Sequence, residues 1–197
     1  MTTAHVLSSC PAALNQSRYT YHHDQVLFVL TTKITEFFAG TPHVQVFADL
    51  PNFHANHCPQ STIPSSLLIT SYRPDIVLYN SQSSSVALLE LTCPLDSNHH
   101  IESARARKQK KPEYLQLLAE FDHLNVTNYY DTIEITVLGH YQVSSIKNLL
   151  NLLKFVHPNI DSPKSAVKNW LDDAAFASIS ASQRIFLARN CKEWYTN

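Results

Sequence analysis

The stretch from residue 73 to residue 94, RPDIVLYNSQSSSVALLELTCP, constrains the fold of this chain more than any other segment. It holds two short apolar runs, IVLY and VALLEL, separated by the polar sequence SQSSS, which is typical of a turn. Asp75 opens the first run, and Glu90 lies near the end of the second. Two adjacent strands joined by a short turn would bring both carboxylates to the same end of a sheet. Carboxylates held side by side repel each other unless a cation neutralises them, so this stretch predicts a divalent-metal site.

Composition narrows the class of protein. With 197 residues, 44% of them hydrophobic, we expect one core domain over residues 1–160 and a helical extension over 161–197. The two glycines, Gly40 and Gly139, are too few for a Gly-rich phosphate-binding loop. The four cysteines form no CxxC pair, which favours a reduced, intracellular protein. No apolar run reaches the roughly 18 residues that span a membrane and no secretory signal is visible, so we expect no membrane partner.

A basic segment follows the carboxylate pair. Residues 102–111, ESARARKQKK, carry five basic side chains and one acidic one, a local charge of +4 in a chain whose net charge is −1. Such a run indicates a nucleic-acid surface, although a solvated helix face would have the same composition. Its position directly after the two carboxylates favours the nucleic-acid interpretation. The basic residues are Arg105, Arg107, Lys108, Lys110 and Lys111.

Hydrophobic periodicity predicts a mixture of helices and strands. The expected elements are helices over 22–38, 97–121 and 144–156, strands over 44–50, 74–79, 85–92 and 131–143, and two C-terminal helices over 164–174 and 178–194. Pro112 marks a kink or a restart within the second helix, because proline removes one helical hydrogen bond. This order predicts an α/β fold in which helices flank a small mixed central sheet, with a C-terminal helical extension.

The carboxylate-bearing strands carry a recognisable pattern. Pro74–Asp75, followed by Glu90–Thr92 on the next strand and then by a basic helix, resembles the PD-(D/E)xK nuclease superfamily. The resemblance implies the restriction-endonuclease-like core and a divalent-metal-dependent endonuclease that uses Mg²⁺ or Mn²⁺. It further implies that Asp75, Glu90 and the backbone carbonyl of Leu91 hold the metal.

A narrower resemblance extends over about residues 10–145 and is most specific at Arg18–Leu27, Arg73–Asp75 and Glu90–Pro94. These segments look like the C-terminal endonuclease region of animal non-LTR retrotransposon polyproteins. The likeness implies a DNA substrate, with RNA not excluded, a retrotransposon origin and a nuclear location.

Thr92 departs from the superfamily pattern, which places a lysine two residues after the glutamate. The retrotransposon nucleases also lack the lysine on this strand, and the resemblance implies that a lysine on the following helix replaces it. Lys108 and Lys111 lie three residues apart, on one face of the predicted helix, so either could serve. The alternative is that catalysis has been lost and a nucleic-acid-binding or protein-interaction module remains.

Further candidates surround this centre. The resemblance gives Asp24 a place at or near the metal, while its position in the predicted helix also suits a helix N-terminal carboxylate. His23 would then lie beside the substrate. Arg73 is predicted either to contact the scissile phosphate or to form a surface salt bridge. Among the basic residues, we assign Arg105, Arg107 and Lys110 to nucleic-acid binding.

Three further hypotheses concern other segments. The HANHC sequence at 54–58 suggests a structural zinc, although the paired spacing and a fourth ligand are missing. Tyr114 is expected in the core rather than stacked on a base. The amphipathic C-terminal helices suggest a homodimer contact, since paired active sites would allow cleavage of both DNA strands.

Overall fold

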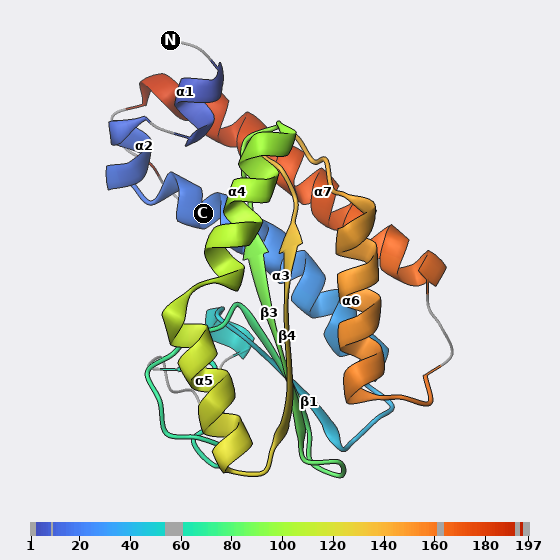
Figure 1. The fold of residues 1–197 in the computed structure, drawn as a ribbon. Coiled ribbons are helices and arrows are strands. Elements are labelled where there is room, and N and C mark those ends of the chain that lie inside the picture. Colours follow the sequence, from blue (N-terminus) through green and yellow to red (C-terminus); the bar gives the residue numbers. More distant parts are fainter. Residues whose placement is uncertain (1–2, 9, 54–60, 161–163, 192–193, 195–197) are drawn as a thin grey trace.

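A four-stranded mixed sheet forms the centre of the computed structural model, which describes residues 3–8, 10–53, 61–160, 164–191 and 194. The strands are β1 (Val44–Ala48), β2 (Ile76–Asn80), β3 (Ser85–Thr92) and β4 (Thr127–Glu134), and they lie side by side in this order. β1–β2 and β2–β3 are antiparallel, whereas β3–β4 is parallel. Helices flank this sheet, so the predicted α/β class is confirmed (Figure 1). The proposed zinc residues His54, His57 and Cys58 lie outside the described residues.

The β2–β3 hairpin brings the two carboxylates to one end of the sheet. Its register runs from Asn80 opposite Ser85 to Ile76 opposite Leu89, so Asp75 and Glu90 follow at the same end. The side-chain oxygen of Asn80 accepts the backbone N–H groups of Gln82 and Ser83, which stabilises the turn predicted here.

The larger core lies on one face of the sheet. It is built from α3 (Arg18–Phe38), α6 (Val143–Val156) and α7 (Lys164–Leu187). The buried side chains of α3, Val26, Leu27, Leu30 and Ile34 among them, recur at helical spacing, which is why this segment folds as an amphipathic helix. α7 adds buried residues from Val167 to Ala175 to the same core, so the C-terminal helix packs on the sheet domain.

The second core lies on the opposite face. It holds Tyr114, Leu117 and Phe121 of α5 (Pro112–His123) against Val86 and Leu88 of β3. Figure 1 shows α5 and α6 on opposite sides of the sheet. Because alternate residues of a strand point to the same face, Glu90 of β3 belongs to the α5 side.

Several element boundaries differ from the sequence prediction. Of the kink or restart predicted at Pro112 within the helix over 97–121, the structure shows a restart: α4 (Asn98–Gln109) ends, and α5 begins at Pro112, where the missing N–H costs nothing. The predicted strand over 131–143 is β4, which begins earlier, at Thr127, because it pairs with β3 from Ser85 onward. It also ends earlier, at Glu134, where its pairing with β3 stops at Thr92.

The helical ends also differ. The two predicted C-terminal helices are the single helix α7, which continues through 175–177 because no glycine or proline interrupts it, and a short 3-10 turn follows at Ala188–Asn190. α3 begins at Arg18 rather than at residue 22, because the buried Arg18 guanidinium donates hydrogen bonds to the carbonyls of Ala188 and Cys191. Hydrophobic periodicity does not predict the short helices α1 (Thr3–Ser8) and α2 (Pro11–Asn15). Within the described ranges, no helix has both the length and the apolar character that crossing a bilayer requires.

Candidate active site

Asp75 and Glu90 form a directly hydrogen-bonded pair at the end of the β2–β3 hairpin. The backbone N–H of Asp75 donates to Glu90 Oε1 at 3.2 Å. The backbone N–H of Leu91 donates to Asp75 Oδ2 at 2.7 Å. Glu90 is fully buried and Asp75 is 7% exposed. The sheet backbone therefore holds the two carboxylates at the same end of the sheet, as the strand pattern predicted.

A lysine from the neighbouring helix α4 reaches both carboxylates. The ammonium group of Lys108 hydrogen-bonds Glu90 Oε2 and lies 3.8 Å from Asp75 Oδ2. The backbone carbonyl of Lys108 accepts the Tyr130 hydroxyl at 2.9 Å, which ties this part of α4 to β4. The structure thus places a helix-borne lysine at the carboxylate pair in place of a strand-borne one.

Thr92 lies on the same face of β3 as Glu90, where the superfamily pattern has its lysine. Its hydroxyl is buried and makes no hydrogen bond with any described residue. Lys111, the other candidate, lies beyond the end of α4 at Gln109 and therefore does not share a helix face with Lys108. Its ammonium group lies 4.8 Å from the centre of the Tyr114 ring. Of the two lysines, only Lys108 meets the carboxylates.

His23 links Asp75 to Asp24. Its Nε2 lies 3.4 Å from Asp75 Oδ2 and its Nδ1 lies 3.4 Å from Asp24 Oδ1. Asp24 is in the second turn of α3 and not in the first, so it is not the helix N-terminal carboxylate that its sequence position allowed. The structure brings Asp24 to the carboxylate pair through His23.

Charge balance explains the protonation of Asp75, Glu90 and Lys108. Burial, and then the charge of Asp75, raise the pKa of Glu90, and Lys108 only partly opposes them. Burial works against the charge of Asp75, but His23 and Lys108 outweigh it and lower the pKa of Asp75. Burial also disfavours the Lys108 ammonium, yet Asp75 and Glu90 outweigh it and raise the pKa of Lys108. Lys108 therefore stays protonated at neutral pH.

Tyr114 encloses the pair from the α5 side. It is 4% exposed, its ring stacks on Tyr130 at 5.3 Å, and its hydroxyl hydrogen-bonds Glu90. Burial and then Glu90 raise the pKa of this tyrosine. The expected core position of Tyr114 is confirmed, but its polar contact with Glu90 had no signal in the sequence, because it depends on how α5 docks on β3.

The donor set fits a hard divalent cation. Two carboxylates are the protein ligands that Mg²⁺ commonly takes while it keeps several waters. The N–H of Leu91 points to Asp75, and the carbonyl of a strand residue points to the same side as its N–H. Continuing the register places Pro74 opposite this carbonyl, and proline has no N–H to occupy it. Among the described residues, no three His, Cys, Asp or Glu side chains are grouped to hold an ion, so such a site would rest on two side chains and a carbonyl.

The predicted nucleic-acid contacts divide into exposed and engaged residues. Arg73 forms an ion pair with Asp49, so a phosphate contact by Arg73 would have to compete with that carboxylate. Arg107 and Lys110 of the α4 region are exposed. Arg105 faces β4, where its Nη2 donates to Glu134 Oε2 at 2.5 Å and to the side chains of Gln142 and Ser144.

The Arg105–Glu134 pair fixes α4 on the sheet, and breaking it should destabilise the protein. Glu134 is 1% exposed, so the Arg105→Leu variant leaves a buried carboxylate without its cation. We expect the free energy of unfolding to fall by about 3 kcal/mol or more. Urea unfolding measures this, with the exposed Arg107→Leu as control, which should change stability by less than about 0.5 kcal/mol. Equal effects of the two substitutions would contradict the structural role of Arg105.

The His23 bridge predicts a pH-dependent stability. Burial opposes its charge, but Asp24 and Asp75 outweigh burial and raise the pKa of His23 from 6.5 to about 10. A raised pKa gives stability that is fully present below about pH 6.5 and is lost as the pH rises through about 10. Between these values, in EDTA, wild-type stability should fall by on the order of 4 kcal/mol more than that of His23→Gln, since each unit of raised pKa contributes about 1.4 kcal/mol. Parallel pH profiles of the two proteins in urea unfolding would refute this assignment.

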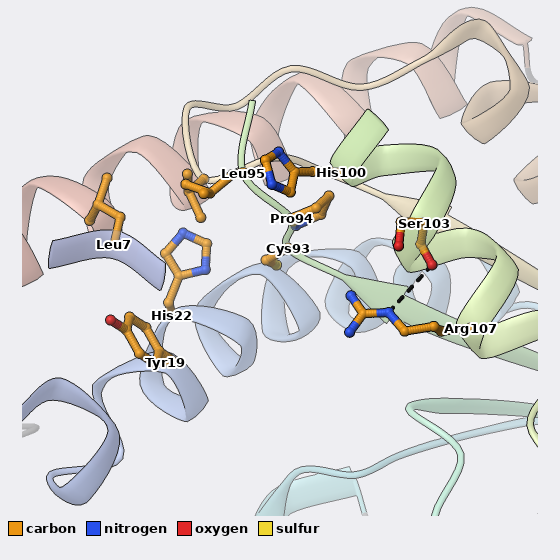
Figure 2. Close-up of a pocket in the computed structure, with 10 residues that line it drawn as sticks. Leu7, Tyr19, His22, Cys93, Pro94, Leu95, His100, Ser103 and Arg107 are labelled. Atoms are coloured by element: carbon orange, nitrogen blue, oxygen red, sulfur yellow. Dashed lines mark hydrogen bonds between the residues drawn. The ribbon is translucent and has the colours of Figure 1, made fainter. Parts of the chain in front are cut away.

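Next to the carboxylate pair lies a cavity that the sequence did not predict. A space of about 450 Å³ is lined by Thr92, Lys108 and Lys111 among others. A second space of about 400 Å³ shares Cys93, Pro94 and Arg107 with it and extends to Tyr19 and His22 of α3 (Figure 2). The tyrosine and histidine stood in the Arg18–Leu27 segment singled out in the sequence, but only the packing of α3 shows that they line a cavity.

Comparison with known proteins assigns no family. No protein-family model matches this chain, and a search of curated proteins gives no significant match.

Proposed function

We propose that this chain is a divalent-metal-dependent endonuclease of retrotransposon origin that hydrolyses phosphodiester bonds in DNA. The observation that carries the proposal is the position of Lys108. A buried carboxylate pair on two adjacent strands is joined by a lysine from the basic helix, where the strand itself offers Thr92. Two carboxylates that can hold a metal ion and a lysine that stabilises developing negative charge are the groups that metal-dependent phosphodiester hydrolysis needs.

Each residue has a chemical role in this proposal. Asp75, Glu90 and the Leu91 carbonyl would hold Mg²⁺ or Mn²⁺, which when bound polarises a phosphoryl oxygen and lowers the pKa of a coordinated water. Lys108, protonated at neutral pH, supplies positive charge to the phosphate rather than acting as a base. His23 favours the ionised form of Asp75, which a cation requires. Arg107 and Lys110, exposed beside this site, suit the DNA backbone.

The test is a cleavage assay with the full chain on double-stranded, single-stranded and branched DNA, and on RNA of the same sequences. We expect cleavage of DNA in Mn²⁺ or Mg²⁺ that stops when EDTA is added. A wild-type protein that leaves every substrate intact in both metals overturns the proposal, and cleavage confined to RNA overturns its DNA specificity.

One observation favours the second candidate, an inactive nucleic-acid-binding or protein-interaction module. The two carboxylates are already neutralised by Lys108 and His23, so the fold has a balanced charge without a bound cation. This alternative predicts no heat of Mn²⁺ binding in calorimetry and no metal-induced rise in Tm. Salt-dependent DNA binding without metal binding would support a nucleic-acid-binding module.

A further inference from the structure

The cavity that extends to Tyr19 and His22 is lined as a nucleotide site would be. Its volume, about 400 Å³, lies in the range of small-molecule pockets. Its walls include the apolar side chains of Leu7, Leu95 and Val137, and its lining contains no carboxylate among the described residues. Arg107 lines both this cavity and the adjoining space beside Lys108. The cavity therefore combines an apolar interior with a cation at the side of the candidate active site.

His22 brings a hydrogen-bond acceptor into this cavity. The side chain is 3% exposed, and its Nε2 lies 3.1 Å from the carbonyl oxygen of Ser178. The Ser178 hydroxyl uses its one hydrogen on the carbonyl of Thr136 at 2.7 Å, so it cannot donate to His22. Nε2 must then carry the hydrogen and donate it to the Ser178 carbonyl, which leaves Nδ1 as an acceptor. Burial also lowers the pKa of His22 to about 4, which keeps the ring neutral.

The Nδ1 atom makes no hydrogen bond with any described residue, although the ring is almost fully buried. Figure 2 shows the imidazole inside the cavity, with Tyr19 and Leu95 beside it and Cys93 towards the α4 side. The Tyr19 ring is held in place because its hydroxyl donates to the carbonyl of Val6 and accepts the N–H of Cys10, both at 3.0 Å. A flat ring with an N–H donor at its edge would satisfy this acceptor and contact these walls.

Arg107 provides the complementary charge. Its Nε donates to the carbonyl of Ser103 at a long 3.4 Å, and its terminal nitrogens form no hydrogen bond or ion pair with the described part of the chain. Figure 2 shows the guanidinium extending from α4 towards the cavity. Arg107 and Lys108 both line the space of about 450 Å³, so a phosphate bound by Arg107 would lie on the same side of α4 as the ammonium group that contacts the carboxylate pair. A guanidinium with free donors is suited to bind a phosphate in two places at once.

We propose that this cavity binds one nucleotide of the substrate strand, with its base unstacked among Tyr19, Leu95 and His22 and its phosphate on Arg107. Every nucleobase carries an N–H donor at its edge for the His22 acceptor, so this site selects an extruded or single-stranded base rather than one sequence. The inference deepens the proposed nuclease function and rests on it for the identity of the ligand. It makes the preferred substrate a single-stranded or unpaired DNA position.

Binding of single nucleotides tests this without any cleavage. Full-length protein with ¹³C-labelled leucine and valine methyls is titrated by NMR, in EDTA, with dAMP, dCMP and 2-deoxyribose 5-phosphate. We expect the two nucleotides to shift the methyls of Leu7, Leu95 and Val137. Both should bind about tenfold more tightly than the sugar phosphate, which is within what base stacking contributes. Equal binding of the sugar phosphate, or no shift at these methyls, overturns the proposal.

Variants locate the two halves of the site. Ser103→Phe fills the cavity from α4 without removing a buried contact and should abolish the nucleotide preference. His22→Leu should also abolish the nucleotide preference. If His22→Leu fails to fold, Ser103→Phe still tests the site. Arg107→Gln should weaken all three ligands, while Lys154→Gln, which removes one positive charge from an exposed position of α6 outside the cavity lining, should weaken none. Unchanged nucleotide binding in Ser103→Phe would contradict the assignment.

The outcomes also separate this proposal from the nuclease itself. The titration contains no metal, so a protein without nuclease activity can still bind nucleotides and thereby support the site. Conversely, if the protein cleaves DNA but shows no nucleotide binding in the titration, the proposed nuclease function stands and the proposed nucleotide site is wrong.

Discussion

Replacing Glu90 or Asp75 with alanine is expected to reduce metal-dependent DNA cleavage by about 10³-fold or more, equivalent to about 4 kcal/mol of transition-state stabilisation. Each substitution removes half of the side-chain ligands available to the cation. DNA binding should persist, because the exposed basic residues of the α4 region are unchanged. Cleavage rates and filter binding at fixed salt concentration measure the two effects.

The control for these variants is Glu102→Ala, which removes an exposed carboxylate from α4 and should leave cleavage within about twofold of wild type, because surface substitutions perturb little. A second measurement does not depend on activity. Saturating Mn²⁺ should raise the Tm of wild type and of Glu102→Ala, but not that of Asp75→Ala or Glu90→Ala. If Mn²⁺ stabilises all four proteins equally, the metal binds elsewhere and the assignment of the pair is wrong.

Substitution of Lys108 with methionine is expected to separate catalysis from metal binding. Cleavage should fall by about 10²- to 10³-fold, the usual effect of removing one group that stabilises developing charge. Mn²⁺ should bind at least as tightly as in wild type, because the ammonium that competes for Glu90 and repels the cation is gone. Single-turnover cleavage and calorimetry measure these two quantities.

Lys111→Met is the matched control, since Lys111 lies three residues further along and contacts the Tyr114 ring instead of the carboxylates. It should keep cleavage within a fewfold of wild type. In EDTA, Lys108→Met should also be less stable than wild type. Glu90 then loses its ion pair with Lys108, and His23 neutralises only Asp75. A Lys111→Met variant that loses cleavage while Lys108→Met retains it would exchange the roles of the two lysines.

The local parts of the fold could be predicted because they depend on short-range pattern. The hairpin that carries Asp75 and Glu90 follows from two apolar runs and a polar turn. The amphipathic stripe of α3 follows from periodic apolar residues, and the restart at Pro112 follows from the missing N–H. Boundaries that depend on distant partners were misplaced. β4 extends to Thr127 because β3 pairs with it, and α3 extends to Arg18 because the end of α7 accepts its hydrogen bonds.

The candidate site divides in the same way. Pairing of adjacent strands brings Asp75 and Glu90 together, and their spacing in the chain already encodes that register. The choice between Lys108 and Lys111 could not be made from helical spacing, since the helix ends between them. The engagement of Arg105 by Glu134 was equally hidden, because a basic residue on a helix looks the same whether it faces solvent or a buried carboxylate.

The sequence by itself determined that two carboxylates would meet at one end of a small mixed sheet, next to a basic helix. Strand alternation and a short turn leave little freedom for any other arrangement. Only the tertiary structure decided which cations neutralise the pair, Lys108 from α4 and His23 from α3, and which residues line the adjoining cavity. The physical reason is that docking of helices on a sheet is set by packing of whole faces, and a side chain acquires its partner, burial and charge state only when those faces are in contact.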